Sequence, residues 1–493
     1  MATVWIGDDS RQVAVGTRLS EVLSHAPHPC GGKGICGRCR IRATGALSPL
    51  SAEEMRHLSE REIADGMRLS CCAVVEGDCV VTLLPDSVMA VVVDGKVSTT
   101  ANHPTFAAYG AAVDIGTTTL AARLYDAVGR LLAQEGCANP QITFGADVLS
   151  RVGAAGEGKD LTAPLQAAVN SLLSRLAEKA GIHPAAIDGV VITGNTAMLC
   201  FLTATDVTAL SRAPFGLPRP FGEVVTAASM GLTALSPNRG VYLPPCASAF
   251  IGGDALCAAL VCGLGDGRTA LLADMGTNGE MLLSHRDALY ACSTAAGPAF
   301  EGVGISCGMP AMNGAVDEVA LVNGTLHPHV MGGGRLQGLC GSGLVDTVAC
   351  LLALEEMTPD GCLGADAVSL WEGITLSQED VRAIQQAKSA VCAGLMTLLH
   401  HSNLSAAEVE VLYTAGGFGS RLNGRNATVI GLLPKGLTAP IRPVGNAALD
   451  GAARLLLDAS ARERMTALAE NVQVVELATD PYFTRQFMTN MSF

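Results

Sequence analysis

Four cysteines near the N-terminus constrain the fold of this chain more than any other feature of its sequence. Cys30, Cys36, Cys39 and Cys71 follow the spacing C-x5-C-x2-C-x31-C, and the first three lie in the glycine-rich segment CGGKGICGRC. A tight loop that supplies three thiolates, with a fourth from a later strand, is typical of an iron–sulfur cluster. The glycines suit such a loop, because its backbone must take unusual φ values and approach the sulfurs closely. We therefore expect an iron–sulfur module here.

Zinc is the alternative metal for such a set of cysteines. Structural zinc sites usually combine paired C-x2-C knuckles, whereas this chain has a single C-x2-C pair preceded by a glycine loop. The spacing therefore favours the cluster. Cys72 adjoins Cys71 and leaves the fourth ligand ambiguous, and the other cysteines lack ligand spacing and are expected to be small core residues.

The composition excludes several classes of function. The 493 residues suffice for two to four domains, and 17 cysteines, an odd number, argue against a disulfide framework. The net charge of −14, with two tryptophans and six tyrosines, argues against a nucleic-acid partner. The most apolar stretch, residues 241–264, contains two prolines and an aspartate, so we expect buried core rather than a membrane span. The start MATVWIGDDSR resembles no secretory leader, and we expect a cytoplasmic protein without a membrane partner.

The N-terminal 84 residues are expected to form a small α+β domain. Ser51 and Glu54 form a capping box that predicts a helix to about residue 65, and residues 76–78 predict a hairpin turn. Further strands are expected at 4–7, 12–15, 38–43, 67–75 and 79–84, and a short helix at 20–25. This order resembles the β-grasp fold of plant- and adrenodoxin-type 2Fe–2S ferredoxins. These ferredoxins place their ligand directly after Arg-Leu-small, here residues 68–70, so the resemblance implies Cys71 rather than Cys72.

Three strand-and-turn motifs downstream indicate a nucleotide site. Two strands run into an acid, a glycine and hydroxyl or amide side chains, a turn that presents backbone N–H groups to anionic oxygens while the acid faces a divalent cation or water. A third strand runs into paired glycines, against which a flat ring and its sugar can lie. The P-loop pattern GxxxxGK[ST] is absent. The residues concerned are Asp114, Gly116, Thr117 and Thr118; Asp274, Gly276, Thr277 and Asn278; and Gly416, Gly417 and Phe418.

The order of these motifs resembles the superfamily of acetate and sugar kinases, heat-shock ATPases and actin. The resemblance implies two α/β ribonuclease-H-like lobes that close over a nucleotide, in an actin-like fold. We expect a ferredoxin domain at 1–84, a linker at 85–110, ATPase lobe I at 111–265, and lobe II with a C-terminal tail at 266–493. Segments 190–196 and 444–452 match the connecting segments of the two lobes.

Other segments carry weaker signals. Residues 296–302 (AGPAFEG) could line the cleft, and residues 339–344 (LCGSGL) could bind phosphate at a helix start, but either could equally be a tight turn. Asp254 in GGDA is expected to be a helix cap rather than a catalytic acid. The tail at 480–493 is expected to be a docking helix.

A ferredoxin module followed by DIGTTT, DMGTNGE, AGPAFEG and AGGFGS resembles the reductive activators of corrinoid-dependent methyltransferases, also known as activating enzymes of O-demethylase systems. The resemblance covers nearly the whole chain. It implies an ATP-hydrolysing reductase that passes one electron from a 2Fe–2S cluster to Co(II) of a corrinoid protein and so regenerates Co(I). It also implies an electron-donor ferredoxin or flavoprotein, and a homodimer.

The resemblance assigns roles to the motif residues. Cys30, Cys36, Cys39 and Cys71 would bind the 2Fe–2S cluster, and the adenosine and phosphates of ATP would contact the glycines and hydroxyls named above. Asp114 and Asp274 would position Mg²⁺ and the attacking water. Longer members of the family have an additional domain between the ferredoxin and ATPase parts, where this chain has a short linker. This difference leaves the gating of access to the cluster open and could mean a different client protein.

Three alternative functions remain at this stage. The chain could reduce another low-potential metalloenzyme, such as a radical enzyme or an iron–sulfur dehydratase. It could be a small-molecule kinase with an accessory cluster, in which case a phosphorylated product would form. It could also be a scaffold with an inert ATPase fold, although the intact Asp114 and Asp274 argue against that.

Overall fold

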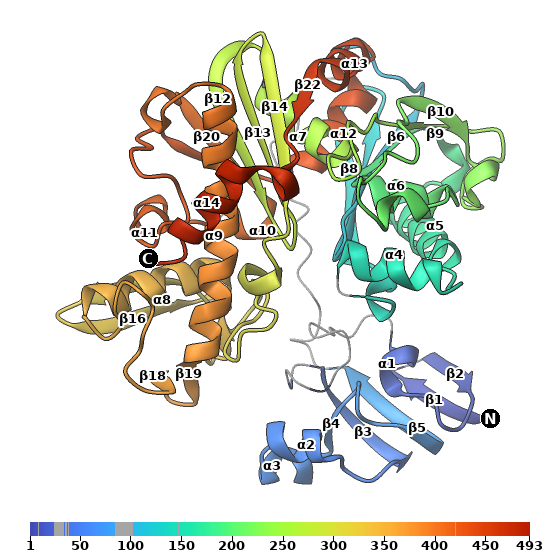
Figure 1. The fold of residues 1–493 in the computed structure, drawn as a ribbon. Coiled ribbons are helices and arrows are strands. Elements are labelled where there is room, and N and C mark those ends of the chain that lie inside the picture. The colour runs from blue at the N-terminus through green and yellow to red at the C-terminus, as the bar shows by residue number, and fades with distance from the viewer. Residues whose placement is uncertain are drawn as a thin grey trace.

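The computed structural model describes residues 1–7, 9–23, 34, 37, 39–83, 102–145, 147–419 and 421–493. Cys30, Cys36 and most of the predicted linker lie outside these residues. Figure 1 shows a small N-terminal domain and two larger lobes, each built around its own sheet. In the described part of the chain, no helix is long and apolar enough to cross a lipid bilayer.

The N-terminal domain is a five-stranded sheet of order β2-β1-β5-β3-β4. Strands β1 and β5 are parallel neighbours, while β2, β3 and β4 pair antiparallel. Val4, Ile41 and Val81 from three strands are fully buried in its core, so the mixed sheet of a β-grasp domain is confirmed. The elements are β1 (Ala2–Ile6), β2 (Asp9–Val13), α1 (Leu19–Val22), β3 (Arg40–Leu47), α2 (Ala52–His57), α3 (Glu60–Ala64), β4 (Met67–Leu69) and β5 (Val75–Leu83).

Three local predictions in this domain are wrong. The single helix expected from Ser51 to about residue 65 is two helices, because Leu58 is extended and a second capping box joins Ser59 to Glu62. The hairpin at 76–78 does not form. Strand β5 continues through these residues, because β3 pairs with Val75 before them and with Cys79 after them, with an irregularity in the register between these two pairs. The expected strand 67–75 ends at Leu69, whose carbonyl accepts the N–H groups of residues 72 and 73 in a turn.

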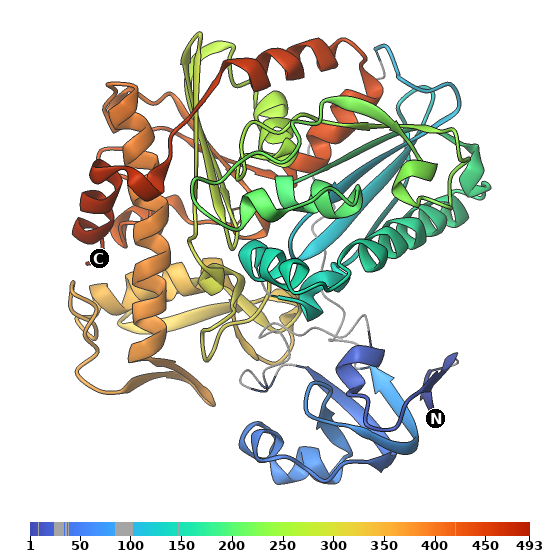
Figure 2. The same cartoon turned by 45° about the vertical axis from the view of Figure 1, so that its right-hand side comes forward.

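The first lobe contains a six-stranded sheet of order β10-β11-β9-β6-β7-β8. The first three strands along the chain, β6, β7 and β8, form an antiparallel meander, and β9 then pairs parallel with β6. Figure 2 shows the teal helix α5 along one face of this sheet. The elements are β6 (Tyr109–Ile115), β7 (Thr119–Asp126), β8 (Leu131–Ala138), α4 (Val148–Gly156), α5 (Thr162–Lys179), β9 (Ile187–Gly194), α6 (Thr196–Leu202), β10 (Glu223–Thr226), β11 (Gly240–Leu243) and α7 (Gly253–Cys262).

The second lobe repeats this topology with a sheet of order β21-β20-β12-β13-β14-β22. Again an antiparallel meander is followed by a strand, β20, parallel to the first. The duplication confirms the two-lobed, actin-like α/β fold. The elements are β12 (Gly267–Met275), β13 (Gly279–Arg286), β14 (Ala288–Thr294), β15 (Ala315–Val322), β16 (Thr325–Val330), β17 (Gly338–Leu339), α8 (Gly341–Ala353), β18 (Ala367–Trp371), β19 (Ile374–Ser377), α9 (Gln378–His401), β20 (Val411–Ala415), α10 (Gly416–Gly419), α11 (Gly424–Val429), β21 (Ile441–Gly445), α12 (Ala447–Leu457), α13 (Ala461–Asn471), β22 (Val472–Val474) and α14 (Pro481–Thr489).

Helices α7 and α12 lie between the two sheets and share one apolar core with both. They cross at Gly451, where an added Cβ would lie 2.3 Å from the carbonyl oxygen of Cys257, so only glycine fits. The C-terminal end of α12 also binds the chain that enters the first lobe: Leu456 O accepts from Thr105 N at 2.9 Å, and Ala459 N donates to His103 O at 2.7 Å. These contacts join the lobes and fix the entry segment.

Candidate functional site

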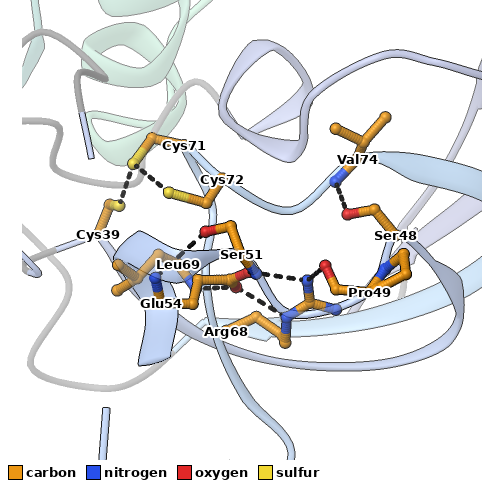
Figure 3. Close-up of polar contacts among 10 residues, drawn as sticks. All are labelled: Cys39, Ser48, Pro49, Ser51, Glu54, Arg68, Leu69, Cys71, Cys72 and Val74. Atoms are coloured by element: carbon orange, nitrogen blue, oxygen red, sulfur yellow. Dashed lines mark hydrogen bonds and ion pairs between the residues drawn. The ribbon is translucent and has the colours of Figure 1, made fainter. Parts of the chain in front are cut away.

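Two of the four predicted cluster cysteines are described, and they lie together. The Sγ atoms of Cys39 and Cys71 are 3.1 Å apart without a disulfide, and both residues are buried. Cys72 Sγ is 3.6 Å from Cys71 Sγ, and Figure 3 shows the three sulfurs converging. The hydrogen bond with Cys39, together with burial, raises the pKa of Cys71 well above its usual range. A cluster ligand must be a thiolate, so metal binding at Cys71 would have to displace this proton.

A buried carboxylate fixes the strand that precedes Cys71. Glu54 accepts from Arg68 Nε at 2.7 Å and Nη2 at 3.0 Å, and from the N–H groups of Leu69 and Ser51, each at 3.0 Å (Figure 3). Burial acts to raise the pKa of Glu54, but these hydrogen bonds outweigh it and lower that pKa. The network therefore anchors α2 to β4 next to the turn that carries Cys71.

The second site is a cleft of about 320 Å³ between the two large lobes. The structure brings together in its walls every nucleotide-site residue that the sequence indicated. From the first lobe come Asp114, Gly116, Thr117 and Thr118, and from the second Asp274, Gly276, Thr277, Asn278, Gly416, Gly417 and Phe418.

Five acidic side chains line this cleft, whereas the sequence indicated only two. Burial first, and repulsion between neighbouring carboxylates second, raise the pKa of Asp254 to about 7, and burial likewise raises the pKa values of Asp114 and Asp274 to about 7. Glu280 and Glu301 are the other two. The predicted helix cap at Asp254 is wrong, because Gly252 is the N-cap of α7 and Asp254 faces the cleft. Asp254 is distant in sequence from both acid-glycine turns, so the sequence did not indicate that it lines the same cleft.

Two asparagines, each directly after a strand and one from each lobe, support the first acid-glycine turn. Asn195 follows β9, caps α6 through Met198 N, and donates to Thr117 Oγ1 at 3.1 Å. Asn446 follows β21, caps α12 through Leu449 N, and donates to Asp114 Oδ2 at 3.0 Å. The repeated Gly-Asn pair that ends both strands is the sequence signal that could have identified them.

The second turn is held by an acid from another element. Glu301, at the end of the 3-10 helix Pro298–Glu301, accepts from Thr277 N at 2.8 Å and Thr277 Oγ1 at 3.0 Å. The backbone N–H and the hydroxyl of Thr277 are therefore both bonded to one carboxylate. The sequence left segment 296–302 undecided between cleft wall and turn, and the structure places Phe300 and Glu301 of this segment at the cleft.

The glycine end of the cleft is flat and apolar. Gly416 has φ +78°, and an added Cβ would lie 2.7 Å from Asp274 Oδ1, so glycine is required. Phe418 stacks on Phe300, with ring centroids 4.5 Å apart and planes 3° from parallel. Gly341, from the second undecided segment, also lines this end. A flat ring could lie here.

Comparison with known proteins matches most of the chain. Residues 109–266 match the family described as the RACo middle region, and residues 268–493 match the C-terminal domain of RACo, the ASKHA domain. The corrinoid activation enzyme RamQ of Eubacterium limosum is 34% identical over 423 residues, which cover 78% of this chain and 70% of RamQ.

Two further proteins are similar over most of their length. The [Co(II) methylated amine-specific corrinoid protein] reductase of Methanosarcina barkeri is 25% identical over 421 residues, 78% of this chain and 77% of the reductase. The solved structure of a reductive activator for corrinoid, iron-sulfur protein superposes with a TM-score of 0.71 at 26% identity, covering 100% of this chain and 98% of that one.

Proposed function

The chain belongs to the RACo family of corrinoid activators, and we propose that it is an ATP-dependent reductase that passes one electron from a 2Fe–2S cluster to Co(II) of a corrinoid protein, regenerating Co(I). The observation that carries this proposal is the presence, in one chain, of a buried thiol pair and an acidic two-lobed cleft. Relatives named for corrinoid activation and for Co(II) corrinoid reduction support it.

The cysteines would hold the redox group. Cys30, Cys36, Cys39 and Cys71 are the proposed ligands, and the convergence of the two described thiols fits such a group. A 2Fe–2S cluster supplies one-electron transfer near −400 mV in plant-type ferredoxins. For a one-electron couple each ~59 mV of deficit costs about a factor of ten in the equilibrium. A corrinoid couple a few hundred millivolts lower therefore requires coupling to ATP.

The cleft would hold Mg²⁺ and ATP. Mg²⁺ usually binds one or two carboxylates and completes its coordination with substrate phosphates and water. We propose Asp114 and Asp274 as those carboxylates and as the groups that orient the attacking water.

The remaining cleft residues would bind the nucleotide itself. We propose that Gly116, Thr117, Thr118, Gly276, Thr277 and Asn278 contact the phosphates, and that Gly416, Gly417 and Phe418 contact adenosine. Because Thr277 is bonded to Glu301, phosphate binding at that turn would require this carboxylate to share or release the threonine. We also propose a ferredoxin or flavoprotein as electron donor, a homodimer, and a cytoplasmic location.

Cobalt spectroscopy tests the function. A candidate corrinoid protein in the Co(II) state is mixed with the reconstituted chain, reductant and Mg-ATP, and the Co(I) absorption is followed. We expect Co(I) only when ATP is present, and no Co(I) with ATP in the variants Asp114→Asn and Asp274→Asn. Equal Co(I) formation without ATP, or ATP consumption with a phosphorylated small molecule as product, would contradict the proposal.

A further inference from the structure

Arg151 is a charged side chain that the proposed function leaves unexplained. It lies on α4 in the first lobe, and its side chain is fully buried. Among the described residues, its Nη2 group has no hydrogen-bond partner. Arg123, also fully buried, differs because its Nη1 lies 2.6 Å from Asp450 Oδ1 in an ion pair.

Among the described residues, the side chain of Arg151 bonds to neutral groups. Its Nε donates to Gly145 O at 3.0 Å, and its Nη1 lies 3.5 Å from Gln141 Oε1 and 3.8 Å from Met198 Sδ. The charge of Asp147 acts to raise the pKa of Arg151, but in the described structure the two form no ion pair, and Asp147 accepts from Ser150 N and Oγ at the start of α4. Burial accordingly lowers the pKa of Arg151 to about 10. A buried charge without a counter-ion is strongly unfavourable, so its presence requires an explanation.

The neighbours of Arg151 lead directly to the first acid-glycine turn. Met198 Sδ, which contacts Arg151, also accepts from Asn139 Nδ2 at 3.4 Å, and this same Nδ2 donates to Gly116 O at 2.9 Å. Gln141, the other neighbour, donates its N–H to Asn139 Oδ1 at 3.0 Å. Asn139 N donates to Thr118 O at 2.9 Å. Asn139 thus binds two carbonyl groups of the turn. Arg151 contacts Gln141 and Met198, the two residues that bond to the side chain of Asn139.

The cleft itself is short of positive charge. Five acids line it, and Arg421 is the single lysine or arginine among the described lining residues. The side chain of Arg421 is half-exposed and forms an ion pair with Asp317. A nucleotide would add further negative charge to the cleft. The positive charge of Arg151, linked to the first acid-glycine turn through Asn139, would then be attracted to the bound nucleotide.

We propose that Arg151 is an electrostatic positioning residue for the phosphates, whose negative charge replaces the protein carboxylate that this arginine lacks. It acts through Asn139 and the Gly116 turn and does not touch the ligand. The inference rests on the proposed binding of ATP, and it extends that function by explaining how an acidic cleft accepts an anionic ligand.

The test compares ligands of different charge in the full-length protein. Calorimetry gives the affinities of wild type, Arg151→Met and Arg151→Lys for Mg-ATP and for adenosine. We expect Arg151→Met to weaken Mg-ATP by about tenfold, as for loss of one charge at moderate distance, and to leave adenosine unchanged. Arg151→Lys should keep most of the ATP affinity. Lys159→Met removes the same charge from an exposed site after α4 and should change neither affinity.

Two results would overturn this inference: an unchanged ratio of ATP to adenosine affinity in Arg151→Met, which includes equal losses for both ligands, or equal losses of ATP affinity in the Lys and Met variants. If Arg151→Met does not fold, Arg151→Gln replaces it under the same criteria. Failure of the wild-type chain to bind Mg-ATP would instead contradict the proposed function itself. A melting temperature of Arg151→Met at or above that of the wild type is also expected, because no carboxylate loses its partner.

Discussion

At the scale of single residues, the geometry around Glu54 decides which thiol faces Cys39. Glu54 binds the N–H of Leu69, and the carbonyl of Leu69 accepts the N–H of Cys72 in the turn that follows. This turn places Cys71 Sγ next to Cys39 Sγ and leaves Cys72 Sγ beyond it, with a larger exposed fraction. The arrangement favours Cys71 as the fourth ligand.

Replacement of each thiol in turn checks this assignment. We expect Cys71→Ala to lose nearly all of the cluster, since a 2Fe–2S centre requires four protein ligands. Cys72→Ala, the matched control one residue away, should retain it. Visible absorption and the EPR signal of the reduced, reconstituted proteins measure the cluster content. Retention in Cys71→Ala with loss in Cys72→Ala would assign the ligand to Cys72.

At the scale of elements, the sequence was informative where a single local pattern decides, and it was misleading where a second local pattern competes or a distant partner decides. The acid-glycine strands β6 and β12 were predicted because strand, acid and turn are contiguous. The break at Leu58 was missed because a second capping box, Ser59 with Glu62, competes with helix continuation. Asp254 was misassigned because its position at the cleft depends on how α7 packs between the sheets.

The crossing of α7 and α12 yields a prediction for one glycine. Gly451→Ala should force the helices apart, since its Cβ would lie 2.3 Å from Cys257 O, and should lower the melting temperature by several degrees. Gly153→Ala is the control, because Gly153 is an exposed helical glycine with nothing within 4 Å of an added Cβ. It should stabilise α4 by about 0.5–1 kcal/mol. Scanning calorimetry measures both, and an unchanged Gly451→Ala protein would refute the contact.

At the scale of the whole molecule, the lobes are joined by a buried ion pair as well as by apolar contacts. Arg123 on β7 lies 2.6 Å from Asp450 on α12, and their side chains are 0% and 4% exposed. Burial of two charges is costly, so the pair is stable only while both partners remain. It therefore fixes how α12 seats against the first sheet.

Removing one partner should accordingly cost more than removing both. We expect Arg123→Met to destabilise the protein by about 3–5 kcal/mol, because Asp450 is left buried without its counter-ion. The double variant Arg123→Met/Asp450→Leu should recover a large part of this loss. Urea unfolding of the two variants and the wild type gives the difference. Equal destabilisation of the single and double variants would show that the charge of Asp450 does not matter.

The two ends of helix α12 contact different parts of the molecule, the cleft at one end and the segment that enters the first lobe at the other. Its first residues follow Asn446, which is bonded to Asp114, and its last turn binds the backbone of residues 103 and 105. These residues are among the first described after position 83. A movement of α12 about Gly451, caused by a ligand bound next to Asp114, would therefore also move the segment at which the chain enters the first lobe.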